Sequence, residues 1–122
     1  MIEIPMSKHF SGNKARCRGD HTPCAVCGQG IAKPWRHAVH VHEGGGRLVQ
    51  EAEAEGLSEG ADLGFWPIGA DCLARHKALR PYAYAWNEGD IAPAFPEEHD
   101  AEAARLARGE GALVPVFPKR AV

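Results

Sequence analysis

The sequence has no excess of charge of either sign. Its 122 residues include 14 Lys and Arg against 16 Asp and Glu, a formal net charge of −2. A chain without a cationic excess has no overall field that would steer it toward nucleic acid. Any contact with DNA or RNA would therefore have to be local.

Long hydrophobic runs are also missing. No stretch approaches the roughly 20 apolar residues that a membrane-spanning helix needs, and the start, MIEIPMSKHF, lacks the apolar core of a secretory signal. We therefore expect a cytoplasmic protein that does not enter a membrane.

Cysteine is scarce, with four residues in the whole chain, at positions 17, 24, 27 and 72. In a reducing cytosol such cysteines are metal ligands more often than disulfide partners. The 14 Gly and 9 Pro imply many turns and loops, and so small a core stabilises such a chain only marginally. A metal that staples the fold would meet that need.

The remaining sequence predicts one small α+β domain. Residues 35–42 alternate as a half-buried strand should, with Val39 and Val41 on one face and His40 and His42 on the other. We expect further strands, helices and loops, with a basic N-terminal arm at 1–22 and a zinc-stabilised domain at 23–122. The expected strands are 47–50, 63–68 and an edge strand at 112–118. One expected helix begins at residue 69 and another covers 97–108, while the acidic segment 51–62 is a solvated excursion or part of an acidic surface.

Two motifs separated by more than forty residues predict a zinc site. CAVCG supplies Cys24 and Cys27 on a tight turn, where Gly28 permits the positive φ that a zinc knuckle requires. DCLARH places Cys72 and His76 at positions i and i+4 of a helix, one turn apart on the same face. A knuckle, a hairpin and a helix that supplies the last ligands form a treble-clef-like site. We therefore predict Zn²⁺ bound by Cys24, Cys27, Cys72 and His76.

The fourth ligand has alternatives at this point. His40 and His42 share a strand face, and either could replace His76. A wholly local set, Cys17, His21, Cys24 and Cys27, would leave Cys72 unexplained and is sterically tight.

A zinc ion with four protein ligands has no open position, so it would be structural. The competing reading is a degenerate HNH-type nuclease, in which a hairpin histidine activates water and a helix histidine binds the catalytic metal. Against it, the second helix cysteine expected in such enzymes is replaced here by Arg75. Such enzymes also carry an asparagine between the hairpin and the helix, and the only asparagines of this sequence are Asn13 and Asn87.

A third reading is a nucleic-acid-binding zinc module. Its phosphate contacts would come from scattered basic residues: Lys8, Lys14, Arg16, Arg18, Arg75, Lys77 and Arg80. The aromatic residues Tyr82, Tyr84 and Trp86 could stack on bases or anchor a protein, although core packing is the simpler interpretation.

Residues 24–80 resemble a loose group of small zinc-binding proteins encoded by phages and other mobile elements. The resemblance covers CAVCG, VHVHEGG and LGFWPIGADC. It implies an accessory protein with Cys24, Cys27 and Cys72 at the motif positions, in a group whose roles include inhibition of bacterial defence systems.

We therefore expect a non-enzymatic, zinc-stabilised binding or inhibitory module. Its partner would be a host protein or protein complex, such as one that handles nucleic acid, more readily than free nucleic acid. The acidic segments 51–62 and 97–102 would repel phosphate and suit a basic protein surface.

Overall fold

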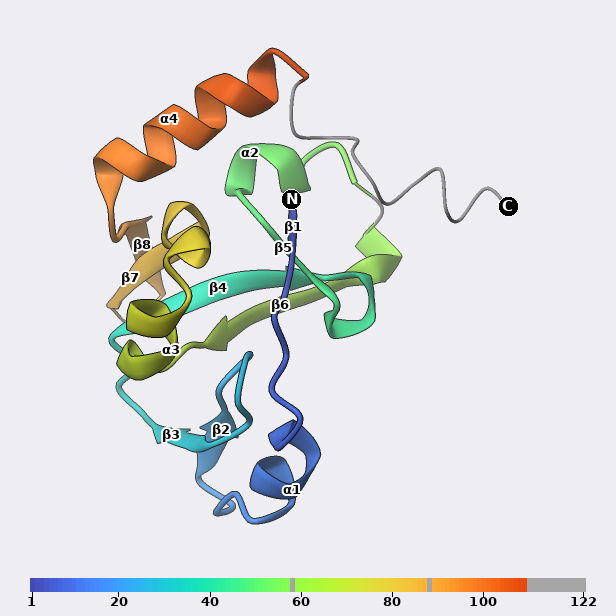
Figure 1. Ribbon diagram of the computed structural model, residues 1–122, viewed down its shortest axis with the longest axis vertical. Helices are drawn as coiled ribbons and strands as arrows, with labels where there is room; N and C mark the ends of the chain where they lie inside the picture. The colour runs from blue at the N-terminus through green and yellow to red at the C-terminus, as the bar shows by residue number, and fades with distance from the viewer. Residues whose placement is uncertain (58, 88, 110–122) are drawn as a thin grey trace.

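The central strand of the molecule is β4 (His37–His42), which pairs with three others. In this computed structural model, which describes residues 1–57, 59–87 and 89–109, β6 (Asp62–Pro67) runs antiparallel along one edge of β4. The other edge is shared, because β5 (Arg47–Val49) pairs with the end of β4 and β7 (Ala83–Asn87) with its beginning. The sheet curls around this strand (Figure 1).

The remaining elements complete a small single-domain α+β fold. Strand β1 (Ile2–Glu3) extends the sheet beyond β5 and β8 (Asp90–Pro93) beyond β7, while β2 (His21–Pro23) and β3 (Gly30–Ala32) form a separate hairpin. The α-helices are α1 (Phe10–Ala15), α2 (Glu51–Ala54), α3 (Ala70–Arg75) and α4 (Pro96–Ala107), and the 3-10 helices are η1 (Glu43–Gly45), η2 (Glu59–Ala61) and η3 (Lys77–Tyr82). No helix among the described residues has the length and apolar character needed to cross a bilayer.

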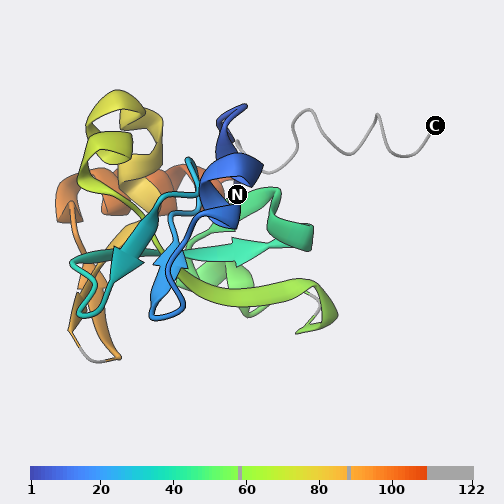
Figure 2. The ribbon, with the colours of Figure 1, turned by 90° about the horizontal axis from the view of Figure 1, so that it is seen from below.

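The β2–β3 hairpin and α1 lie together at the end of the molecule opposite α4 (Figure 1). Seen from that end, they lie in front of the sheet (Figure 2). The amide of Ser7 donates to the carbonyl of Val26 at 2.9 Å, and the Asn13 side-chain amide donates to the carbonyl of Cys27 at 2.8 Å. These bonds hold the chain that precedes the hairpin against it.

The hydrophobic core occupies one face of the sheet. Because side chains alternate along a strand, Val39 and Val41 of β4 point to this face, where they are 0% and 3% exposed. They pack in one cluster with Leu48 of β5, Leu73 of α3 and Val26 of the hairpin. The core face thus joins the sheet to the segment that carries the first two cysteines.

Most of the predicted elements are confirmed. The alternating segment forms β4, 47–49 returns as β5, and α4 ends before Gly109, whose φ is +78°. The helix predicted from residue 69 is shorter than its pattern suggested, because α3 ends at Arg75 and a 3-10 helix follows. The edge strand predicted at 112–118 lies outside the described residues.

The N-terminal segment is more regular than predicted. We expected a basic arm without strands or helices at 1–22, but Ile2 pairs with Leu48 across β1 and β5, and α1 follows. The segment forms a strand because the apolar side chains of Ile2 and Ile4 pack against the core. A strand of two residues cannot be recognised from the amino-acid composition of the segment. The boundary between residues 22 and 23 stays a prediction.

The aromatic series at 82–86 divides between core and surface. Tyr82 and Tyr84 are 1% and 3% exposed, and burial raises the pKa of both hydroxyls. Trp86 is half-buried and lies with its ring centroid 5.4 Å from that of Trp35. The two tyrosines are therefore core residues.

Candidate metal centre

The first two cysteines sit on the tight turn between β2 and β3. Two backbone bonds close this turn: the Cys24 amide donates to the Gln29 carbonyl at 2.8 Å, and the Gly28 amide donates to the Cys24 carbonyl at 2.9 Å. Gly28 has a φ of +80°, as predicted, and a Cβ there would lie 2.4 Å from the carbonyl oxygen of Phe10. Only glycine allows both the turn and the close approach of α1.

Strand β6 and the start of α3 bring Cys72 to this turn. The Ala25 amide donates to the carbonyl of Pro67, the last residue of β6, at 3.0 Å. The Gly69 amide, at the start of α3, donates to the Cys24 sulfur at 3.3 Å. Cys72 lies in the first turn of α3, so the same junction turns its side chain toward the loop.

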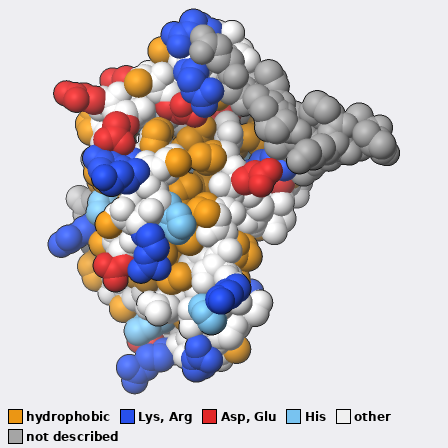
Figure 3. All heavy atoms as spheres, in the orientation of Figure 1, with side chains coloured by type: hydrophobic (Ala, Val, Ile, Leu, Met, Phe, Trp, Pro, Cys, Tyr) orange, Lys and Arg blue, Asp and Glu red, His pale blue; other side chains and the backbone are white. Residues whose placement is uncertain are grey.

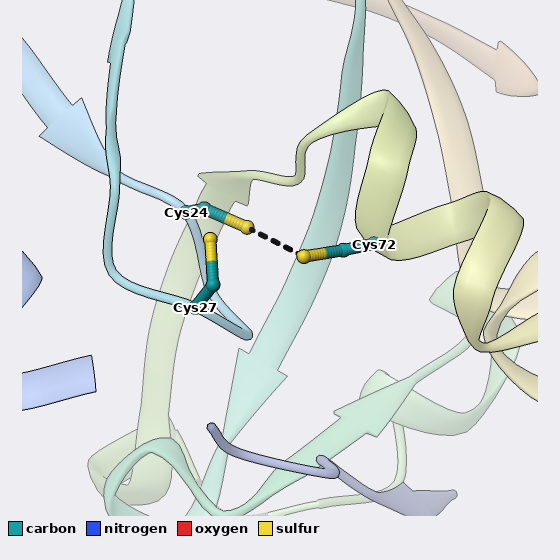
Figure 4. Close-up of side chains that lie close together, drawn as sticks. All are labelled: Cys24, Cys27 and Cys72. Atoms are coloured by element: carbon teal, nitrogen blue, oxygen red, sulfur yellow. Dashed lines mark hydrogen bonds between the residues drawn. The ribbon is translucent and has the colours of Figure 1, made fainter. Parts of the chain in front are cut away.

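The three thiols converge, as Figure 4 shows. We call Cys24, Cys27 and Cys72 the thiol cluster; their sulfur atoms all lie within 4.8 Å of one another. The Cys24 and Cys72 sulfurs are 3.8 Å apart, far beyond the disulfide bond length of about 2.05 Å. Two thiolates bonded to one tetrahedral zinc at about 2.3 Å would lie roughly 3.8 Å apart. The spacing therefore fits a shared metal ion.

The surroundings of Cys72 disfavour its thiolate in the absence of a cation. Cys24 and Cys72 are 1% and 4% exposed. Burial, with the neighbouring Cys24 and Cys27 thiols, raises the pKa of Cys72 to about 12. A divalent cation would offset the charge of several adjacent thiolates, which is the chemistry that such a donor set performs.

His76 is placed at the C-terminal cap of α3 and is half-buried. Its amide donates to the Cys72 carbonyl at 2.8 Å, but its backbone has left the helix, with φ −119° and ψ 77°. Its ring does not join the group of donor atoms within 4.8 Å that the three thiols form. Its assignment as the fourth ligand stays a prediction.

Cys17 and His21 lie beside Gly30, at the start of β3. Gly30 lines a hollow together with the thiol cluster. A Cβ on Gly30 would meet the Cys17 sulfur at 2.8 Å and the His21 Nδ1 at 3.1 Å. Cys17 and His21 thus lie near a residue that borders the thiol cluster, but neither belongs to the group of donor atoms within 4.8 Å that the three thiols form.

His40 and His42 belong to a different group. We call His40, His42 and Asp62 the histidine cluster; their donor atoms lie within 4.8 Å of one another. The two imidazoles project from the face of β4 opposite Val39 and Val41, with ring centroids 5.5 Å apart. They are 6% and 2% exposed. The predicted common face is confirmed, and it faces away from the core.

A β-bulge brings Asp62 to the histidines. Val41 pairs with Gly64, but His42 pairs with Asp62, so Leu63 is an extra residue in β6. Gly64 has a φ of +75°, a conformation common at such bulges. With a regular register, Leu63 would stand opposite His42.

Two acidic residues in this arrangement were missed by the sequence analysis. His40 Nδ1 lies 3.0 Å from a Glu51 carboxylate oxygen, and its Nε2 lies 2.8 Å from an Asp62 oxygen. The segment 51–62 is therefore not wholly a solvated excursion. The available signal was the pair of histidines on a half-buried strand, since buried imidazoles need hydrogen-bond partners and the acidic segment 51–62 follows the hairpin in the sequence.

The Gly64 amide donates to Asp62 Oδ1 at 2.7 Å. This bond, and then the contact with His40, holds the pKa of the Asp62 carboxyl below its ordinary value. Asp62 therefore stays ionised at neutral pH and can act as an anionic ligand or ion-pair partner.

The described residues thus hold two groups that could bind a metal ion. One offers three soft thiol ligands, and the other offers two imidazoles and a carboxylate. Comparison with protein-family models, curated proteins and solved structures gives no match. The chemistry of these two groups is consequently the basis for a function.

Proposed function

We propose that the chain is a non-enzymatic binding module whose fold is stapled by a structural zinc ion in a treble-clef-like site. The convergence of three cysteine sulfurs from two distant segments carries this proposal. A zinc ion held there ties the β2–β3 hairpin to α3, and its binding free energy would be part of the folding free energy.

We propose His76 as the fourth ligand of the zinc ion. A shift of the chain after Arg75 would bring its ring toward the thiols. His21 is the comparison, because its Nδ1 lies close to Gly30, and Gly30 borders the thiol cluster. His76→Ala should weaken zinc binding, whereas His21→Ala should not. The reverse result would assign the position to His21.

An apolar hollow next to the knuckle supports binding of a protein partner. It has a volume of about 190 Å³ and is lined mainly by apolar side chains, among them Ile4, Phe10, Ala25, Val41 and Trp66. This is below the 300–1,000 Å³ typical of small-molecule pockets, and it suits an apolar side chain of another protein. Met6 and Leu63 border it and are 50% and 46% exposed.

Charge favours a protein over nucleic acid as the partner. On the face drawn in Figure 3, basic side chains stand in separate groups with hydrophobic side chains between them. Arg80 is engaged within the fold, since it pairs with Glu98 at 2.8 Å and lies over the Phe95 ring. The resemblance of the motifs to phage accessory proteins supports a host protein, in the role of an inhibitor or adaptor.

The structural zinc site and the partner-binding surface are tested by separate experiments. For the zinc site, native mass spectrometry should show zinc bound to the full chain, and replacement by Co²⁺ should give thiolate-to-cobalt charge-transfer absorption. Zinc-free protein that is fully folded would refute the staple.

For the surface, tagged wild-type protein and the variant Leu63→Glu are used to capture partners from a bacterial lysate. Ala107→Glu, on α4, is the control. A host protein retained by the wild type and the control but lost by Leu63→Glu supports the proposal. Retention that is equal in all three, or plasmid cleavage with Mg²⁺ or Mn²⁺, would overturn it.

A further inference from the structure

The histidine cluster resembles a ligand set more than a simple hydrogen-bond network. His40 has a carboxylate oxygen at hydrogen-bond distance on both ring nitrogens. His42 differs: its Nε2 lies 4.0 Å from Asp62 Oδ2, too far for a hydrogen bond. His42 is only 2% exposed, and its ring presents a donor atom within 4.8 Å of those of His40 and Asp62. Three ligand atoms thus converge on one point from two strands.

The contact between His40 and Glu51 is the kind that orients a metal-binding histidine. In metal sites the second ring nitrogen of a ligating histidine commonly donates to a carboxylate, which fixes the tautomer and leaves the other nitrogen for the metal. Glu51 Oε2 lies 3.0 Å from Nδ1, so Nε2 is the nitrogen that faces Asp62. The Glu51 amide, in turn, donates to the Tyr84 hydroxyl at 2.8 Å, which anchors the start of α2.

The charges near the cluster also suit a divalent cation. Glu51 and Asp62 contribute two negative charges, and two neutral imidazoles contribute none. Arg47, across from His42 on β5, is paired with Glu43 at 3.2 Å. A divalent ion would therefore be neutralised by the two carboxylates, one as a ligand and one through His40.

Solvent can reach the cluster from one side. The Asp62 side chain is 35% exposed, whereas those of His40 and His42 are 8% and 2% exposed. An ion held by these three residues would thus have protein on one side and water on the other. Two imidazoles and one carboxylate suit first-row transition ions.

We propose that His40, His42 and Asp62 bind a divalent first-row transition-metal ion, with water in the remaining positions and Glu51 orienting His40. This site is independent of the zinc staple, because it uses none of the cysteines. The competing arrangement is a protonated His40 between two carboxylates with no metal.

The test uses the full chain, first loaded with zinc and then titrated with Co²⁺. Binding is followed by calorimetry and by absorption. We expect a further equivalent of Co²⁺ that gives ligand-field absorption without thiolate-to-cobalt charge transfer. Charge transfer would instead report exchange at the thiol cluster, so the two sites are distinguished in one experiment.

Three variants locate the second ion. Asp62→Asn and His42→Gln should weaken its binding at least about tenfold, and Glu51→Gln about 10–100-fold, as losses of orienting carboxylates do elsewhere. His9→Ala, which changes an exposed histidine, should leave binding unchanged. If His42→Gln does not fold, Asp62→Asn still decides the question, because the Asp62 side chain is partly exposed.

NMR of the imidazole ¹⁵N nuclei provides a second measurement. On addition of Zn²⁺ to the zinc-loaded chain, the Nε2 resonance of His40 should shift and that of His9 should not. A chain without the additional equivalent, or one whose additional equivalent is unchanged in both Asp62→Asn and His42→Gln, overturns the proposal.

Discussion

The thiol cluster and the histidine cluster lie on opposite sides of the central sheet and are assembled in different ways. The thiol cluster joins a turn to a helix 48 residues further along the chain, and it packs with the core. The histidine cluster is built mainly within two adjacent strands and opens to solvent at Asp62. A soft, enclosed site suits a structural ion, and an imidazole–carboxylate site with access to water suits an exchangeable one.

The largest effect on zinc binding and stability should come from removing Cys72, which joins α3 to the turn that carries Cys24 and Cys27. We expect Cys72→Ser to abolish zinc binding and the cooperative unfolding transition, because structural zinc contributes on the order of 10 kcal/mol in small zinc-dependent domains. Native mass spectrometry and thermal unfolding measure the two properties. Cys17→Ser is the control and should preserve both; a Cys72→Ser protein that keeps its zinc would show that Cys72 is not a ligand.

A smaller change on the thiol side is Gly28→Ala. It forces an L-residue into φ +80° and places a methyl group 2.4 Å from the Phe10 carbonyl oxygen. We expect a loss of at least about 2 kcal/mol in the free energy of unfolding, measured with urea. Gly19→Ala is the matched control, since a Cβ there meets nothing within 4 Å. Equal stability of the two variants would refute the tight packing of α1 on the knuckle.

The corresponding change on the histidine side is Gly64→Ala. Its φ is +75° but a Cβ there has open space, so only the backbone strain remains, about 1–2 kcal/mol. The strain should loosen the bulge and shift the Asp62 and His40 resonances in NMR spectra without changing zinc content. Gly56→Ala, which lacks a positive φ, should do neither. Unaltered resonances in Gly64→Ala would show that the bulge does not position Asp62.

The smallest effect on the two clusters comes from a change that touches neither of them. Glu102 accepts a hydrogen bond from the Tyr82 hydroxyl and pairs with Arg105. The bond from Arg105, followed by that from Tyr82, lowers the pKa of Glu102 below its ordinary value of 4.5. Its stabilising effect is therefore present above pH 4.5 and is lost as the pH falls through the lower, folded-state pKa.

We expect Glu102→Gln to cost about 1–2 kcal/mol at pH 7 and progressively less in acid. Urea unfolding at several pH values measures this difference, and Glu97→Gln, at the exposed start of α4, is the control. A difference from the wild type that stays constant down to pH 2 would contradict the assignment. Metal binding at both clusters should be unaffected.

Local patterns in the sequence predicted the parts of these sites that depend on neighbouring residues. The positive φ of Gly28, the common face of His40 and His42, and the alternation that buries Val39 and Val41 all follow from turn geometry or strand periodicity. The proximity of Cys72 to the knuckle followed from donor chemistry and is present among the described residues.

Other features could not be read from local patterns. The end of α3 at Arg75 leaves His76 outside the group of three thiols, although the helical spacing had placed it on the same face as Cys72. The strand β1 could not be predicted from the sequence, because two residues are too few to show a periodic pattern.

By itself, the sequence determined which donor atoms are present and which of them share a turn or a strand face, because both depend on backbone geometry over a few residues. The tertiary structure decided which acids meet the histidines. Asp62 reaches His42 only because Leu63 is an extra residue in β6, and Glu51 reaches His40 through the start of α2. A one-residue change of register reverses which side chain faces a neighbouring strand, and that register is set by the packing of the whole sheet.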